Sequence, residues 1–146
     1  MGLEGSGSFG KSGWLIRIDL SPRVIIRNKM QVESYSFGRI RIEGKEYLTD
    51  LWVVNGGVER RLKNISRSKF GTSHKVSKEE VERIVTPKTR RVIIGTGSSG
   101  LLSLSEDARA YLEGKGIALE EYRSGELAGK KVEMGGEDSA IIHLTC

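Results

Sequence analysis

The stretch that decides the fold is RRVIIGTGSSGLLSLSEDARAYLEGKGIALEEY, residues 90–122. It opens with a β-branched run, residues 91–94, that is typical of a buried strand. Ser105 has the side chain of a helix N-cap, and Gly114 marks the end of the helix that follows. Residues 117–122 then form another strand. Because strands alternate with helices in this half of the chain, we expect a mixed sheet.

Upstream of this stretch, Ser77-Lys78-Glu79-Glu80 forms a capping box, in which Ser77 and Glu80 bind each other's main-chain amides. The helix that it starts should end before Pro87. Residues 37–42 and 46–54 flank a turn at Glu43-Gly44 and indicate a β-hairpin.

The remaining segments are less regular. Residues 58–75 have no clean period and are expected to be strand edge and loop. A short helix is expected over 126–134 and a final strand over 140–145. The Gly/Ser-rich residues 1–13 form a predicted flexible tail, and residues 14–33 form a predicted N-terminal strand extension. Residues 34–146 then make a single α/β domain.

Composition narrows the class of protein. Cys146 is the only cysteine, so no internal disulfide can form, which is typical of a cytoplasmic protein. The apolar runs are far shorter than the roughly 20 residues that cross a bilayer, so we expect no membrane span. The net charge of +5 permits anionic partners.

Two glycine-rich motifs resemble nucleotide-binding loops. Residues 5–12 match the phosphate-loop pattern, but the strand and helix that the pattern needs are missing. The second motif follows a strand and comprises Gly95, Thr96, Gly97 and Gly100. Its last glycine lies five residues before the helix start at Ser105. That distance favours a turn between two strands, near a possible pocket, over a dinucleotide site. No cofactor is expected.

Metal-binding and catalytic motifs are also missing. The only histidines, His74 and His143, have no ligand spacing with Cys146, so no metal site is predicted. His143 lies between Ile142 and Leu144 on a strand and is expected to be a hydrogen-bonded structural residue. No catalytic residue can be assigned, and the sequence favours a protein that is not an enzyme.

The strongest functional signal is a basic segment over residues 60–75. It contains no acidic residue, and its turn adds hydroxyl and imidazole donors. Such a combination can bind an anion or an acidic partner. The alternative is a solvated loop whose charges are met elsewhere in the chain. The predicted site consists of Arg60, Arg61, Lys63, Arg67, Lys69, Thr72, Ser73 and His74.

Several separated stretches resemble one family, the small α/β domain of the adipogenesis-associated domain-containing protein and of a mitochondrial complex I (NADH dehydrogenase) assembly factor. Residues 65–74 are similar to those of the family's archaeal members. The resemblance covers residues 34–146 and rests on Ser36-Phe37-Gly38-Arg39-Ile40, Gly44-Lys45-Glu46-Tyr47 with Asp50, Ile94-Gly95-Thr96-Gly97 and His143-Leu144-Thr145-Cys146.

The resemblance implies a three-layer α/β fold with a mixed central sheet, flanking helices and an additional β-hairpin layer. It implies no established enzyme activity, and its eukaryotic members look like assembly or regulatory factors. This chain departs from the family at residues 1–33, which have no counterpart, and at residues 125–136, which are shorter and richer in glycine.

These observations together predict a binding or assembly factor that acts through the basic segment on an anionic ligand or an acidic protein surface. The alternative is an enzyme for a small anionic substrate, with a pocket near Arg67, Lys69 and His74. An aromatic content of 6%, with Phe70 alone among the bases, disfavours nucleic acid. A deep pocket would favour the enzyme, whereas a flat basic face would favour a macromolecular partner.

Overall fold

The computed structural model describes residues 29–146. The predicted tail over 1–13 and the strands predicted over 14–28 lie outside the described residues. β1 runs through the boundary that was predicted between residues 33 and 34, and its side chains Met30 and Val32 lie in the core. Within the described part of the chain, no helix is both long and apolar enough to cross a membrane.

A mixed sheet of five strands forms the centre of the molecule, as expected. Its strand order is β5-β4-β11-β7-β9. β7 runs parallel to β9 and β11, whereas β4 runs antiparallel to β11 and β5. The strands are β4 (Leu51–Val54), β5 (Gly57–Arg60), β7 (Arg91–Thr96), β9 (Ala118–Tyr122) and β11 (Asp138–His143).

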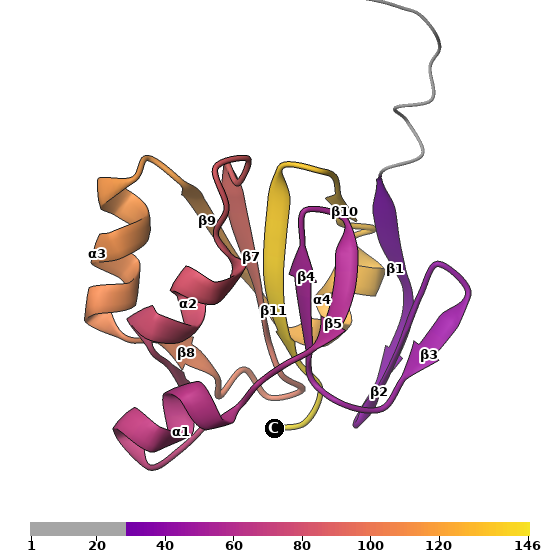
Figure 1. The fold of residues 1–146 in the computed structure, drawn as a ribbon. Helices are drawn as coiled ribbons and strands as arrows, with labels where there is room; N and C mark the ends of the chain where they lie inside the picture. Colours follow the sequence, from indigo (N-terminus) through magenta and orange to yellow (C-terminus); the bar gives the residue numbers. More distant parts are fainter. Residues whose placement is uncertain (1–28) are drawn as a thin grey trace, which may run out of the picture.

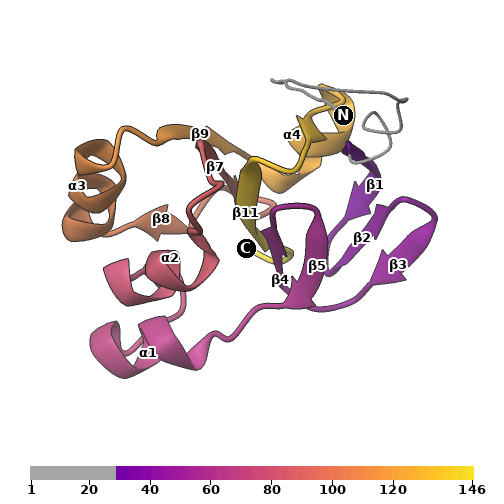
Figure 2. The same ribbon diagram turned by 45° about the horizontal axis from the view of Figure 1, so that its top comes forward.

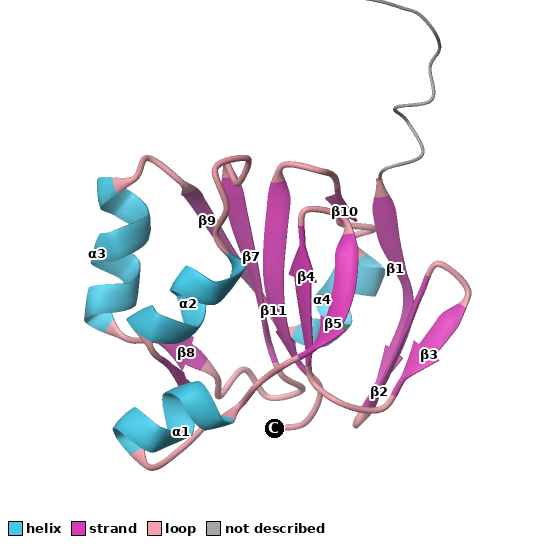
Figure 3. Ribbon diagram, in the orientation of Figure 1, coloured by secondary structure: helices cyan, strands magenta, loops and turns pink. Residues whose placement is uncertain are grey.

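Helices and a second sheet cover the two faces of this sheet (Figures 1 and 2). On one face lie α2 (Lys78–Ile84) and α3 (Glu106–Gly114), and α1 (Asn64–Phe70) packs beside α2. On the other face lie α4 (Ser124–Gly129) and an antiparallel sheet of order β10-β1-β2-β3. Its strands are β10 (Glu133–Met134), β1 (Met30–Ser36), β2 (Arg39–Ile42) and β3 (Lys45–Tyr47). Figure 3 shows α1, α2 and α3 on one side of the central sheet, and α4 with the strands β1 to β3 on the other.

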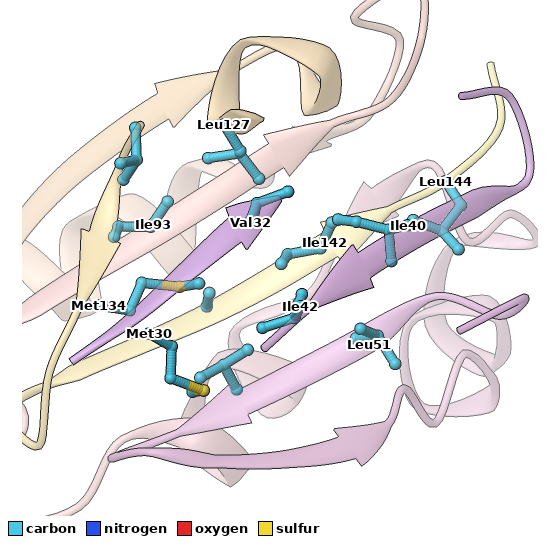
Figure 4. Packing of buried hydrophobic residues seen from close by; sticks show 13 residues of the cluster. Met30, Val32, Ile40, Ile42, Leu51, Ile93, Leu127, Met134, Ile142 and Leu144 are labelled. Atoms are coloured by element: carbon cyan, nitrogen blue, oxygen red, sulfur yellow. The ribbon is translucent and has the colours of Figure 1, made fainter. Parts of the chain in front are cut away.

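Alternate residues of the central strands supply two cores. Ile93 and Ile142 face the small sheet and α4, as Figure 4 shows. Their neighbours Ile94 and Ile141 face α2 and α3. This division follows from the period of two in a strand, and it explains why β7 and β11 are buried at nearly every position.

The hairpin predicted around Glu43-Gly44 is present, because β2 pairs with β3. Its second arm, however, is not one strand over residues 46–54. β3 ends at Tyr47, and β4 begins at Leu51 in the central sheet. The three residues between them carry the chain from one sheet to the other, and Asp50 becomes buried there.

Two further expectations were only partly right. Residues 58–75 contain β5, α1 and β6 (Lys75–Val76), which pairs with β8 (Ser103–Leu104). The sequence does not indicate α1, because the helix has no apolar stripe. Ser66 is its only buried residue. The helix expected over 126–134 is α4, which begins and ends earlier, and β10 follows it.

The turn at Gly95–Gly100 leads into the short strand β8 before α3 begins, as predicted for a turn between strands. Its glycines allow a close approach to the end of the chain. Gly97 has φ +99°, and a Cβ there would lie 2.5 Å from the carbonyl oxygen of Thr145. A Cβ at Gly100 would meet nothing closer than 3.5 Å.

We therefore expect Gly97→Ala to destabilise the protein more than Gly100→Ala. Both substitutions put a side chain at positive φ, which costs about 1–3 kcal/mol, but only the first also displaces main chain. Chemical unfolding of the two variants measures the difference. Equal losses in the free energy of unfolding would show that Gly97 is needed only for its positive φ, and not for the close approach of Thr145.

Candidate functional site

Three segments meet at one edge of the central sheet. Leu51, the first residue of β4, lies opposite Ile142 near the end of β11. Thr96, the last residue of β7, lies beside His143. Asp50, Gly97 and His143 therefore lie close together, where β4 begins and where β7 and β11 end. These strand ends lie near the mark C in Figure 1. The carboxyl ends of parallel strands, which meet here, are where open α/β sheets usually bind ligands.

The centre of this edge is Arg61, whose side chain is fully buried. It follows β5, and its main-chain amide donates to the Asp50 carbonyl across the β4–β5 hairpin. Its guanidinium donates to both carboxylate oxygens of Glu80, at 2.7 and 3.1 Å, and to Asp50 Oδ2 at 2.9 Å. Another bond, of 2.7 Å, goes to the Ser73 carbonyl. The charge of Arg61 is thus balanced inside the protein by Glu80 and Asp50.

Glu80 is buried as well and gathers three elements. Besides Arg61, it accepts from the Trp52 indole at 2.9 Å and from the Ser66 hydroxyl at 2.5 Å. The predicted capping box is therefore only half present. Ser77 Oγ accepts from the Glu80 amide, but the Ser77 amide donates to Ser66 Oγ instead of to Glu80. The Glu80 carboxylate binds Arg61 instead. The bond from the Ser77 amide to Ser66 attaches the start of α2 to α1.

Asp50 joins this network to His143. Burial by itself would raise the pKa of Asp50, but hydrogen bonds from His143 and from the Leu144 amide, with the charge of Lys63, lower that pKa to about 2. Asp50 Oδ2 lies 2.7 Å from His143 Nδ1. His143 is buried and hydrogen-bonded, as predicted.

A cleft of about 420 Å³ opens over this network. Arg60, Lys63 and Arg67 line it with positive charge, and Leu48 and Leu62 line it with apolar surface. Asp50, Thr145 and Leu144 contribute the side nearest β11. Lys63 Nζ lies 3.8 Å from Asp50 Oδ2, so only one carboxylate approaches the three cations within the described part of the chain.

The other residues of the predicted site are distributed elsewhere. Lys69 pairs with Glu79 at 3.0 Å and with Asp107 at 3.3 Å, away from the cleft. Thr72 Oγ1 accepts from the His74 amide, and the Ser73 carbonyl accepts from Arg61. The basic segment is thus divided into a buried cation, a paired cation and a group that faces the cleft.

His74 lies with His143 and Cys146. Their ligand atoms fall within 4.8 Å of one another, although the spacing of these residues along the chain is not that of a metal site. Spacing along the chain could not reveal the set, because the three residues come together only through the sheet. Asp50 was missed as a site residue for the same reason, since its partner His143 lies 93 positions away.

The Gly95–Gly100 turn holds the end of the chain. The amides of Ser98 and Leu101 donate to the main-chain oxygens of Thr145 and Cys146, at 2.7 and 3.2 Å. The Gly97 amide donates to Ser124 Oγ. These amides correspond to those that would contact a pyrophosphate in a dinucleotide-binding turn. Here they already have partners.

We predict that Glu80→Ala lowers the free energy of unfolding by about 3–5 kcal/mol, because it leaves the Arg61 charge buried without its main partner. The neighbouring substitution Glu79→Ala is the control, since it removes an exposed carboxylate from the same helix and should cost far less. Urea denaturation of both variants measures the two losses. Similar losses would contradict the role assigned to Arg61.

The lowered pKa of Asp50 makes stability depend on pH. In the folded protein this carboxyl binds its proton more weakly than in the unfolded chain, so its stabilisation is present above pH about 4 and is lost as pH falls towards about 2. The stabilisation corresponds to about 2 kcal/mol. We expect Asp50→Asn to lack this component of the acid dependence. Unfolding curves recorded in metal-free buffer across that range would show it, and parallel curves for the two proteins would refute it.

The chain is similar to several proteins of known structure and to one protein family. The conserved hypothetical protein PH1505 from Pyrococcus horikoshii is 34% identical, with a TM-score of 0.71 over 80% of this chain and 99% of that one. The protein MT938 is 28% identical, with a TM-score of 0.64 over the same shares. A protein from Bordetella parapertussis shares the fold, at 12% identity and a TM-score of 0.57 over 79% of this chain and 95% of that one. No curated protein matches the sequence. Residues 32–129 match the model of a protein family of unknown function, DUF498/DUF598. The chain belongs to the DUF498/DUF598 family.

Proposed function

We propose that this protein is a non-catalytic binding factor that takes an acidic side chain of a protein partner into the cleft between Arg60, Lys63 and Arg67. The observation that carries the proposal is the gathering of three cations and two exposed leucines around one cleft. The cations favour an acidic group as the ligand, and the apolar surface favours a protein as the molecule that carries it.

Two of the cations at the cleft have no acidic partner among the residues that the structure describes. Asp50 and Glu80 face Arg61, and Asp50 is also shared with Lys63 and His143. Within residues 29–146, Arg60 has no ion-pair partner, and the only side chain that Arg67 binds is Asn64, at 3.3 Å. These two guanidinium groups are available to an incoming carboxylate, which they can bind through two parallel hydrogen bonds.

The apolar surface favours a protein over a small ion. Leu48 is 67% exposed and Leu62 is 45% exposed, and both line the cleft. Large apolar side chains at the rim of a charged cleft suit a partner that brings apolar residues beside its acidic group. The sequence resemblance to a complex I assembly factor and to the adipogenesis-associated domain also supports a role in binding or assembly.

The alternative of an enzyme with a pocket near Arg67, Lys69 and His74 has less support. Arg67 lines the cleft, but Lys69 and His74 are not among its lining residues. Lys69 is paired on the side of α1 that faces Glu79 and Asp107. One anionic substrate in this cleft would therefore not meet all three groups.

The proposal is tested with a fluorescently labelled peptide of alternating glutamate and leucine, its binding followed by anisotropy. We expect Arg60→Ala/Arg67→Ala to weaken binding at least about tenfold, because each charge-assisted contact contributes about 1.5–3 kcal/mol. The control Lys88→Ala/Arg90→Ala removes the same charge just before β7, at the opposite edge of the sheet, and should leave binding unchanged at equal ionic strength.

Two results would count against the proposal. Equal binding by the two double variants would show that the attraction is only the net charge of the protein. If inorganic phosphate protects wild type but not Arg60→Ala/Arg67→Ala against heat, while no peptide binds, the cleft holds a small anion rather than a protein partner.

A further inference from the structure

All the imidazole and thiol groups of this chain lie in one place. The sequence contains two histidines and one cysteine. His74 precedes β6, His143 ends β11, and Cys146 follows it, yet their ligand atoms lie within 4.8 Å of one another. Imidazole nitrogen and thiolate sulfur are the ligands that zinc and similar divalent transition metals prefer.

The distances are close to those of a tetrahedral site. Cys146 Sγ lies 3.8 Å from His74 Nε2, and the two imidazole rings meet edge to face at 5.1 Å between centroids. With metal bonds of about 2.0–2.3 Å, ligand atoms in a tetrahedron lie about 3.4–3.6 Å apart. Small rotations of the half-buried side chains His74 and Cys146 would bring the set to this size.

His143 is oriented as metal-bound histidines usually are. Its Nδ1 faces the Asp50 carboxylate at 2.7 Å, and a carboxylate can only accept a hydrogen bond. In the neutral ring the proton is therefore on Nδ1, and the lone pair is on Nε2. Nε2 has Thr145 Oγ1 as its side-chain neighbour, at 3.4 Å. A carboxylate behind the imidazole fixes the ring and makes the nitrogen a better ligand.

The other two ligands are held by main-chain bonds. The His74 carbonyl accepts from the Ser103 amide at 2.9 Å, and the preceding carbonyl accepts from Arg61. The Cys146 main-chain oxygen accepts from Ser99 and Leu101 of the glycine-rich turn. The elements that carry the three ligands are thus connected before any metal arrives.

We infer that His74, His143 and Cys146 form a binding site for a divalent transition metal of the zinc type. Nε2 of His143, a ring nitrogen of His74 and the thiolate of Cys146 supply three ligands, and the fourth position is left to a water molecule or another small ligand. Binding releases the thiol proton of Cys146, so the affinity rises with pH. This site is separate from the three cations of the cleft.

Cobalt(II) reports on such a site through its spectrum. Titration of the reduced full chain should produce a thiolate-to-cobalt charge-transfer band and the strong visible bands of tetrahedral coordination, saturating at one cobalt per chain. Zinc(II) should abolish both. Because Cys146 is the only cysteine, the charge-transfer band can come from no other residue.

Variants assign the ligands. Cys146→Ser should lose the charge-transfer band. His74→Ala should weaken cobalt binding at least as much as removal of the carboxylate partner of His143 does. Asp50→Asn, which removes that partner of His143, should weaken binding by about 10- to 100-fold while keeping the band at saturation. Circular dichroism checks that each variant is folded. The variants of the half-buried residues His74 and Cys146 keep the test decisive if Asp50→Asn does not fold.

The outcome is independent of the function proposed for the cleft. Arg60→Ala/Arg67→Ala should titrate with cobalt like wild type, whether or not the acidic peptide binds. The inference is overturned if the reduced wild type shows no charge-transfer band, if saturation needs two chains per cobalt, or if His74→Ala binds cobalt as tightly as wild type.

Discussion

The buried guanidinium of Arg61 is the constraint on which the rest of this edge depends. A charge without solvent is costly unless it is fully paired and hydrogen-bonded. Here two carboxylates and a main-chain carbonyl satisfy it, and they come from the start of β4, from α2 and from the segment before β6. One side chain thereby links these three segments.

The two carboxylates, Glu80 and Asp50, each bind further groups besides Arg61. Glu80 binds Ser66 and Trp52, so α1 is attached through polar contacts although it buries no apolar stripe. Asp50 binds His143 and the Leu144 amide, so the end of β11 is held against the start of β4. Asp50 lines the cleft and also binds His143, whereas His74, His143 and Cys146 are not among the residues that line the cleft.

This arrangement changes the meaning of the basic segment. Along the chain its cations look equivalent, because no acid lies among them. In the structure Arg61 is structural, Lys69 is paired with Glu79 and Asp107, and Arg60, Lys63 and Arg67 face the cleft. The counter-charges come mostly from Asp50, Glu79 and Glu80. Only Asp107 comes from the stretch after Ser105, in which acidic residues outnumber basic ones. A site defined by charge alone would therefore join groups that do different things.

The sequence by itself determined the features that depend on neighbouring residues. The alternation around Glu43-Gly44, the serine caps of α2 and α3 and the apolar run of β7 each arise from contacts within a few positions, and they led to a mixed α/β sheet. Only the tertiary structure decided that Arg61 is buried, that α1 is a helix and that Asp50 meets His143. Those outcomes depend on which strands become neighbours, and hydrogen bonds across some 90 residues leave no local period in the sequence.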